Sequence, residues 1–207
     1  MAAAGTLMEV GLDQLAETFA RQCMVSGDIN AKQSALLFLF EMHHNRGRRE
    51  QARKVLEELD GIAPPASSAR KELADAYERL GDLNKSIDVL SRLLSGLGNR
   101  ITPDTRMKMA LMLSKTGQEE AALKQWRSLW LETNSIARRR YVEERLMAVA
   151  SRLGKLAQMA ITLEKKLIAG TANDRESGLL VRLYIKVNDP VSATEIIEEH
   201  MRRSGKK

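Results

Sequence analysis

The sequence is poor in the residues that mark several classes of protein: it has one cysteine, four prolines and 4% aromatic residues. Cys23 cannot form a disulfide within the chain, which is typical of a reducing compartment, so we expect a cytoplasmic protein. No stretch approaches the ~18 consecutive apolar residues of a membrane-spanning helix. The N-terminal segment lacks the apolar core of a signal peptide, because Glu9, Asp13 and Glu17 interrupt it. We therefore expect no membrane partner.

Short catalytic motifs are also missing. The chain has no glycine-rich phosphate loop, no HExxH zinc motif and no nucleophile elbow. His43 and His44 are adjacent, so they point to different sides of a helix, and no His or Cys follows four residues later to complete a metal site. We favour a packing role for His43. These absences predict a protein that is not an enzyme and holds neither a cofactor nor a metal.

What the sequence does contain is a surplus of good helix formers. Hydrophobic residues make up 43% of the chain, with Leu, Ala and Met at most apolar positions and no run of β-branched residues. This composition predicts an all-α fold. The net charge of +6 comes from 33 basic and 27 acidic residues, which permits nucleic-acid or acidic protein partners without requiring them.

The stretch from Arg70 to Leu94 predicts two short amphipathic helices joined at Gly81-Asp82. A glycine there adopts the left-handed turn that ends a helix at little steric cost. Small and bulky residues on both sides form stripes at helical spacing, namely Leu73, Ala74, Tyr77, Ser86, Leu90 and Leu93.

The same arrangement recurs around four further anchor residues, and it thus predicts a repeat architecture. The five anchors are Gly47, Gly81, Gly117, Gly154 and Asn188, with separations of 34, 36, 37 and 34 residues. Asn tolerates the left-handed backbone better than other non-glycine residues, so Asn188 can replace the glycine.

The pattern resembles the tetratricopeptide repeat (TPR), whose signature spaces bulky, aromatic and small residues over 34 positions. The residues at signature places are Ala52, Pro64, Tyr77, Ala122 and Trp126. The glycine of the signature Leu-Gly pair is replaced by Phe40, Ala74, Ala110, Met147 and Val181. The resemblance covers residues 31–204 and implies a right-handed α-α superhelix, a TPR-like solenoid of about five helix pairs plus an N-terminal helix.

We predict one array over residues 1–207. Its parts are an N-terminal helix in 1–29 and repeats in 30–64, 65–100, 101–135, 136–173 and 174–207. We expect the N-terminal helix, from about Thr6 to Val25, to cover the apolar run Leu36–Phe40. Repeat arrays normally end in polar capping helices, and neither end of this sequence has the pattern of one. We therefore expect a fragment of a longer protein or a subunit of an assembly such as a homo-oligomer.

In the TPR family the first helix of each pair lines a concave groove. The resemblance thus implies a non-catalytic scaffold that presents this groove to a partner protein or peptide. The groove residues that we single out are Glu41, His44, Lys71, Asp75, Arg79, Met107, Lys115, Tyr141, Arg152 and Lys186. The residues that stand two positions before the anchors form a mostly cationic row, which suits an acidic peptide. They are Asn45, Arg79, Lys115, Arg152 and Lys186.

A second hypothesis is a helical-repeat RNA-binding module, because RNA-reading repeats also consist of helix pairs of similar length. The cluster Arg138–Arg140 is a candidate anion contact, although Glu143 and Glu144 can offset its charge. The first helices lack a regular polar pair for reading bases, so nucleic acid is the less favoured partner.

The two tryptophans lie one helical turn apart. Trp126 stands at a core place of the repeat and should be buried. Trp130 lies at the end of the same helix, where it either contacts a partner or packs against the next pair. We favour packing.

Overall fold

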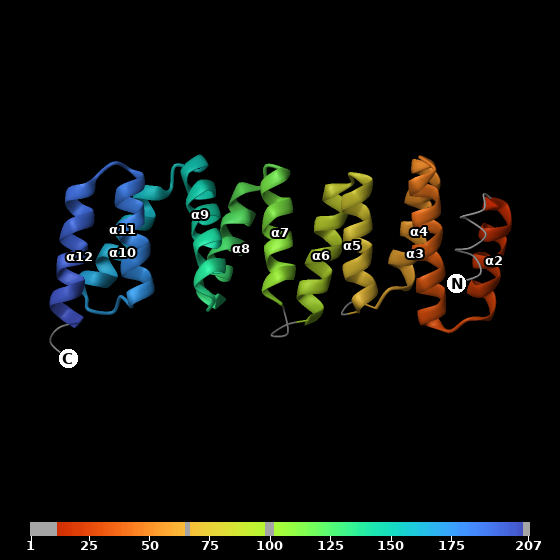
Figure 1. The fold of residues 1–207 in the computed structure, drawn as a ribbon, viewed down its shortest axis with the longest axis horizontal. Coiled ribbons are helices and arrows are strands. Elements are labelled where there is room, and N and C mark those ends of the chain that lie inside the picture. Colours follow the sequence, from red (N-terminus) through yellow and green to blue (C-terminus); the bar gives the residue numbers. More distant parts are fainter. Residues whose placement is uncertain (1–11, 65–66, 98–101, 205–207) are drawn as a thin grey trace. The chain divides into compact units, whose positions relative to one another are not determined.

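The structure is a computed structural model that describes residues 12–64, 67–97 and 102–204 (Figure 1). Within these residues it consists of helices α2 to α12 and their connections, without a strand. The predicted all-α fold is therefore confirmed. The chain divides into two compact units, an N-terminal unit of residues 1–112 and a C-terminal unit of residues 113–207. The division lies within α7.

The N-terminal unit is a series of antiparallel helices. It contains α2 (Asp13–Ser26), α3 (Ile29–Asn45), α4 (Arg49–Ile62), α5 (Ser68–Leu80), α6 (Leu83–Leu97) and most of α7 (Pro103–Lys115). From α2 to α6 each helix packs against the next along the chain, and α3 also approaches α5. The first helices of these two pairs are thus neighbours. The part of the predicted N-terminal helix that precedes residue 12 lies outside the described residues.

The C-terminal unit continues the alternation with the end of α7 and five further helices. These are α8 (Glu119–Glu132), α9 (Ile136–Arg152), α10 (Leu156–Ile168), α11 (Asp174–Lys186) and α12 (Pro190–Ser204). Close packing joins α8 to α9, α10 to α11 and α11 to α12. By contrast, α9 and α10 approach each other at few points. The two helices of this pair are therefore packed less closely than α11 and α12.

All five predicted anchors have a left-handed backbone. Their φ angles are 69° at Gly47, 84° at Gly81, 74° at Gly117, 66° at Gly154 and 61° at Asn188. Asn188 is the only non-glycine residue with positive φ in the described part of the chain. The predicted turn chemistry is thus confirmed at each anchor.

The core is built from the apolar stripes of the helices, and its largest fully buried side chains are Trp126, Tyr77 and Phe40. The predicted burial of Trp126 is confirmed. The run Leu36–Phe40 is apolar throughout, which predicts burial on every side of its helix, but Leu37 and Phe38 keep part of their surface exposed. Although α3 contacts α2, α4 and α5, one strip of its surface stays open.

The sequence predicts that the second helix of the first repeat ends at residue 60 and that Ser67 or Ser68 caps the next helix, and the structure differs at both points. The helix continues through Gly61 and Ile62 before the chain turns. Ser67 stands at the N-cap of α5, but its hydroxyl donates to the carbonyl of Pro64 at 2.8 Å instead of capping the helix. The backbone donors at the start of α5 are therefore not capped by this side chain.

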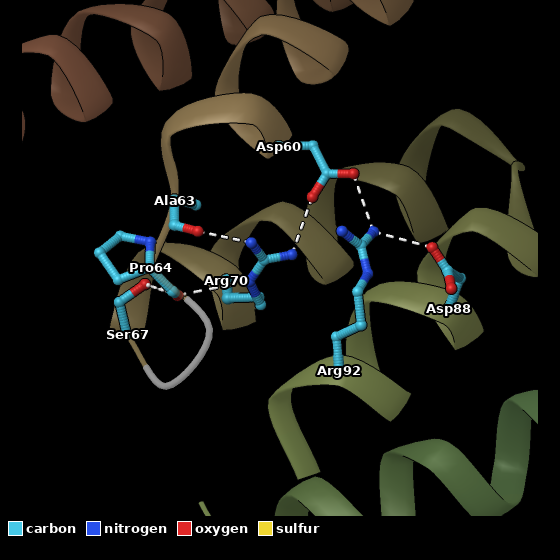
Figure 2. A network of polar contacts seen from close by, with 7 residues as sticks. All are labelled: Asp60, Ala63, Pro64, Ser67, Arg70, Asp88 and Arg92. Atoms are coloured by element: carbon cyan, nitrogen blue, oxygen red, sulfur yellow. Dashed lines mark hydrogen bonds and ion pairs between the residues drawn. The ribbon is translucent and has the colours of Figure 1, made fainter. Parts of the chain in front are cut away.

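Arg70 closes that junction in a network drawn in Figure 2. Its guanidinium donates to the carboxylate of Asp60 at 2.8 Å and to the carbonyls of Ala63 at 2.5 Å and Pro64 at 3.3 Å. Arg92 donates at 2.8 Å to the other carboxylate oxygen of Asp60. Burial alone would raise the pKa of Asp60, but the hydrogen bonds and charges of Arg92 and Arg70 outweigh it and hold that pKa below its ordinary value.

His43 lies in α3 with 3% of its surface exposed, as expected for a packing residue. Its Nε2 atom is 3.9 Å from a carboxylate oxygen of Glu17 in α2. Burial lowers the pKa of His43 below its ordinary value of 6.5, and Arg48 and Arg21 act in the same direction, against Glu17. The folded protein therefore favours the neutral imidazole.

We expect the free energy of unfolding to decrease as the pH falls through 6.5, the ordinary pKa of histidine. Below that pH the unfolded chain binds a proton that folded His43 resists, so protonation favours unfolding. Urea denaturation on either side of this pH measures the effect. His43→Phe, which places an aromatic ring where the next repeat has Tyr77, should reduce the difference. An equal pH dependence in both proteins would contradict this account.

Candidate functional site

Three predicted groove residues of the N-terminal unit gather around one aromatic ring. Arg79 of α5 forms two hydrogen bonds with Glu41 of α3, at 2.5 and 2.9 Å, and its guanidinium carbon lies 5.0 Å from the centre of the Phe40 ring. The imidazole ring of His44 stacks on the same Phe40 ring, with the two ring centres 5.4 Å apart. The structure thus brings Glu41, His44 and Arg79 together. Their charged groups already have partners within the chain.

The remaining predicted residues of this unit are less concentrated. Asp75 forms an ion pair with Lys108 of α7, which also lies 3.0 Å from Glu78. Lys71 is exposed and Met107 is half-buried. Charges on successive first helices therefore neutralise one another across this face.

In the C-terminal unit the predicted residues are separated. Tyr141 packs edge-on against Trp126 at 6.2 Å and has Arg145 over its ring at 5.1 Å. Arg152 forms two hydrogen bonds with Glu119, at 2.6 and 3.0 Å, and these raise the pKa of its guanidinium. Lys115 and Lys186 are exposed. The row of cations predicted from the anchors is therefore partly neutralised, since both of its arginines are paired.

The sequence suggested that Glu143 offsets the charge of Arg138–Arg140, but in the structure Glu143 has other partners. It is buried, accepts a hydrogen bond from the indole N–H of Trp130 at 3.1 Å, and pairs with Arg182 of α11. Trp130 is 4% exposed, so the prediction that it packs against the next pair is confirmed. The Glu143 carboxylate thus links Trp130 of α8 to Arg182 of α11.

The surface feature that the sequence did not indicate is a cavity of about 320 Å³ in the C-terminal unit. It opens among α8, α9, α10 and α11, where α10 lies away from α9. Its apolar walls are formed by Leu123, Trp130, Leu146, Met159, Leu163 and Leu179. A signal was present in the spacing of Leu123, Arg127 and Leu131, four residues apart along one side of a helix.

Three cations stand at the edge of this cavity. Lys155 pairs with Glu120 at 2.6 Å, and Lys166 pairs with Glu176 at 2.5 Å. Burial alone would raise the pKa of Glu176, but hydrogen bonds from Lys166 and the Asn173 backbone, with the charge of Lys166, hold it below its ordinary value. Arg127 is exposed, and within the described part of the chain it has no carboxylate partner. Arg127 is thus a free cation beside an apolar hollow.

A second hollow of about 410 Å³ lies between α10 and α12 and has the opposite charge. Its apolar residues are Leu167, Ile168 and Ile196, and its acidic residues are Glu164, Glu195 and Glu199. The neighbouring Tyr184 donates a hydrogen bond to Glu164. Burial, together with the carboxylates of Glu164, Asp189 and Glu195, raises the pKa of Tyr184 to about 12.

No family model and no curated protein matches the chain. Among solved structures, the MamA protein is 13% identical over 84% of this chain and 93% of that chain, with a TM-score of 0.51. The MamA RS-1 ArsTM double mutant is 18% identical over 86% and 97%, with a TM-score of 0.50. A chain described as a Podosopora anserina kinesin light chain with nearly identical TPR-like repeats is 15% identical over 84% and 96%, with a TM-score of 0.45.

The chain has a TPR-like helical-repeat fold. The anchored helix pairs and the likeness to the two MamA structures support the resemblance that the sequence suggested. At these identities the likeness extends to the fold alone.

The TPR-like helices expose large apolar side chains unevenly. In the described residues, four of them lie in or beside α2, namely Leu12, Leu15, Val25 and Ile29. The other nine belong to the C-terminal unit, and they are Leu131, Ile136, Ile161, Ile168, Ile185, Val187, Val191, Ile197 and Met201. The C-terminal unit therefore combines the cavity with the largest share of exposed apolar surface.

The described residues contain no group of three or more His, Cys, Asp or Glu side chains arranged to bind a metal ion. Nor is any helix in residues 12–64, 67–97 and 102–204 long and apolar enough to cross a membrane.

Proposed function

We propose that the chain is a non-catalytic scaffold that binds a partner protein. The observation that carries this proposal is that nine of the thirteen exposed large apolar side chains in the described residues belong to the C-terminal unit, where Leu131 also lines a cavity with apolar walls. Exposed apolar surface of this kind is what a protein contact buries. The TPR-like fold is suited to this role because stacked repeats present extended helix surfaces to a partner.

The predicted first-helix groove is a second surface for the same function. In the N-terminal unit its charges are largely paired, as with Glu41 and Arg79, so little free charge is left to select an acidic peptide. Lys71 and Lys186 are exposed members of the predicted groove and can be tested without disturbing packing. The cytoplasmic location stays a prediction.

RNA binding is less well supported than protein binding. A base-stacking platform needs a free aromatic face. Tyr141, which lies near the arginine cluster, is half-buried with one contact to Trp126 and another to Arg145. We therefore keep RNA as an outcome of the experiment.

We expect the immobilised chain to capture a defined set of proteins from native lysate, unchanged by nuclease. Leu131→Glu and Ile168→Glu place a charge on apolar side chains that are 58% and 80% exposed, and they should abolish capture. Val25→Glu is the matched control, because Val25 is 87% exposed but lies in α2. Mass spectrometry of the captured proteins is the measurement.

The same experiment separates the alternatives. Capture that depends on Lys71→Glu and Lys186→Glu, instead of the apolar sites, would assign the partner to the first-helix groove. Loss of all captured material on nuclease treatment would favour RNA, as would a steep decrease of binding with salt. Equal capture by all variants would contradict both protein-binding surfaces.

A further inference from the structure

The last described helix, α12, has an apolar ridge that no other helix in the described residues covers. Ile197 and Met201 are 45% and 66% exposed, and they lie four residues apart, so they are neighbours on one side of the helix. Glu198 is exposed beside them. The ridge is therefore a short apolar strip with a negative charge at its edge.

The cavity among α8 to α11 has the complementary character. Its volume of about 320 Å³ is sufficient for two aliphatic side chains. Apolar side chains line it, among them the buried Trp130 and Leu163 and the exposed Leu131. The free cation Arg127 stands at its edge, with Lys155 and Lys166 nearby. An occupant should thus have two apolar side chains on a helix and a carboxylate next to them.

We propose that this occupant is α12 of a second copy of the chain. In this contact Ile197 and Met201 enter the cavity, and Glu198 pairs with Arg127. The inference rests on the proposed function, since it names the protein partner of the C-terminal unit as the chain itself. Apolar burial supplies most of the affinity, and the charge pair selects the orientation.

Charge also decides between the two hollows of the C-terminal unit. The hollow between α10 and α12 carries Glu164, Glu195 and Glu199, so an acidic ridge on a second copy would be repelled there. The cationic cavity is the surface that attracts it. Because the ridge and the cavity are different surfaces, two copies either exchange both contacts in a closed dimer or add further copies in an open chain.

The test is sedimentation velocity of the full chain across a wide range of concentration. We expect reversible self-association with a dissociation constant on the order of tens of micromolar, because the contact is small. A closed dimer and an open chain of copies both agree with the proposal and are distinguished by the largest species observed. A chain that stays monomeric at the highest concentrations overturns it.

Variants assign the association to this contact. Met201→Glu and Arg127→Glu change exposed side chains, and each should weaken association about tenfold or more. The double variant Arg127→Glu with Glu198→Arg restores opposite charges and should recover most of the loss. Lys124→Glu is the matched control on α8, because Lys124 is exposed and does not line the cavity. Ile185→Glu is the control for an exposed apolar residue elsewhere in the unit.

Trp130 reports whether the cavity itself is occupied. The chain has two tryptophans, and Trp126→Phe removes the one that is fully buried. In that variant the emission of Trp130 should shift with concentration in parallel with sedimentation. Association without this shift, or without recovery in the double charge variant, overturns the proposed contact.

Failure of this inference is distinguishable from failure of the proposed function. A monomeric chain that still captures other proteins through Leu131 and Ile168 refutes self-association and leaves the scaffold intact. A chain that neither associates nor captures protein refutes both.

Discussion

Replacing Trp126 by alanine is expected to lower the free energy of unfolding by about 4 kcal/mol, the largest effect of any substitution that we consider. Trp126 is completely buried and is the largest fully buried side chain in the described residues. Its ring packs edge-on against Tyr141 of the following helix at 6.2 Å. Alanine would leave a cavity at the contact between α8 and α9, which the surrounding helices cannot fill without moving.

Trp126→Phe is the matched control for this prediction. It keeps an aromatic ring and removes an indole N–H that has no hydrogen-bond partner among the described residues, so we expect a loss of only about 1 kcal/mol. Urea denaturation followed by far-ultraviolet circular dichroism measures both variants without relying on tryptophan emission. Equal losses for Ala and Phe would show that the packed volume at this position is not what stabilises the unit.

Arg70→Met is expected to lower the free energy of unfolding by about 3 kcal/mol, because one partner of a buried ion pair is removed. The Arg70 side chain is 6% exposed and the Asp60 side chain 21%. Methionine preserves the aliphatic stem but leaves the carbonyls of Ala63 and Pro64 without this donor. Those carbonyls lie where the chain turns from α4 into α5, as Figure 2 shows, so the junction itself should loosen.

The control for Arg70 is Arg79→Met. Arg79 also pairs with a carboxylate, that of Glu41, but the two side chains are 46% and 39% exposed. Exposed pairs contribute little, so we expect a change below about 0.5 kcal/mol. Urea denaturation compares the two, and hydrogen exchange at the start of α5 locates the effect. A similar loss in both variants would contradict the role of burial.

The pH dependence of the free energy of unfolding tests the same network independently. Because the pKa of Asp60 is lowered in the folded protein, its contribution is fully present above the ordinary value of 3.8. It is lost as the pH falls below that value, since the unfolded chain then binds a proton more readily than the folded one. Arg70→Met should therefore weaken this acid dependence.

Features that depend on local interactions along the chain were predicted correctly, whereas those that depend on residues far apart in the sequence were not. The helices, their turns and most of the core could be predicted, because they depend on neighbours within a few residues. Gly81 illustrates this: its left-handed φ of 84° follows from its place between two helical stripes. The end of α4 was missed by two residues because Gly61 remains helical despite its low propensity.

The partners of charged residues could not be predicted in the same way. Glu41 pairs with a residue 38 positions later, and Glu143 with one 39 positions later, each on the first helix of the following pair. The sequence contains many acidic residues at comparable distances, so spacing alone does not select among them. Glu143 was thus assigned to its local arginines, whereas in the structure its carboxylate pairs with Arg182 of α11.

The sequence by itself determined the all-α class, the repeat of about 34 residues and the burial of Trp126, because each depends on a periodic pattern of apolar and turn residues. Only the tertiary structure decided which surfaces are available for binding. The cavity exists because α10 packs on α11 and away from α9, and the groove arginines Arg79 and Arg152 are neutralised because carboxylates of other helices reach them. Both results depend on how helices of different repeats pack against each other. That packing is set by side chains from several helices together, so no local stretch of the sequence determines it.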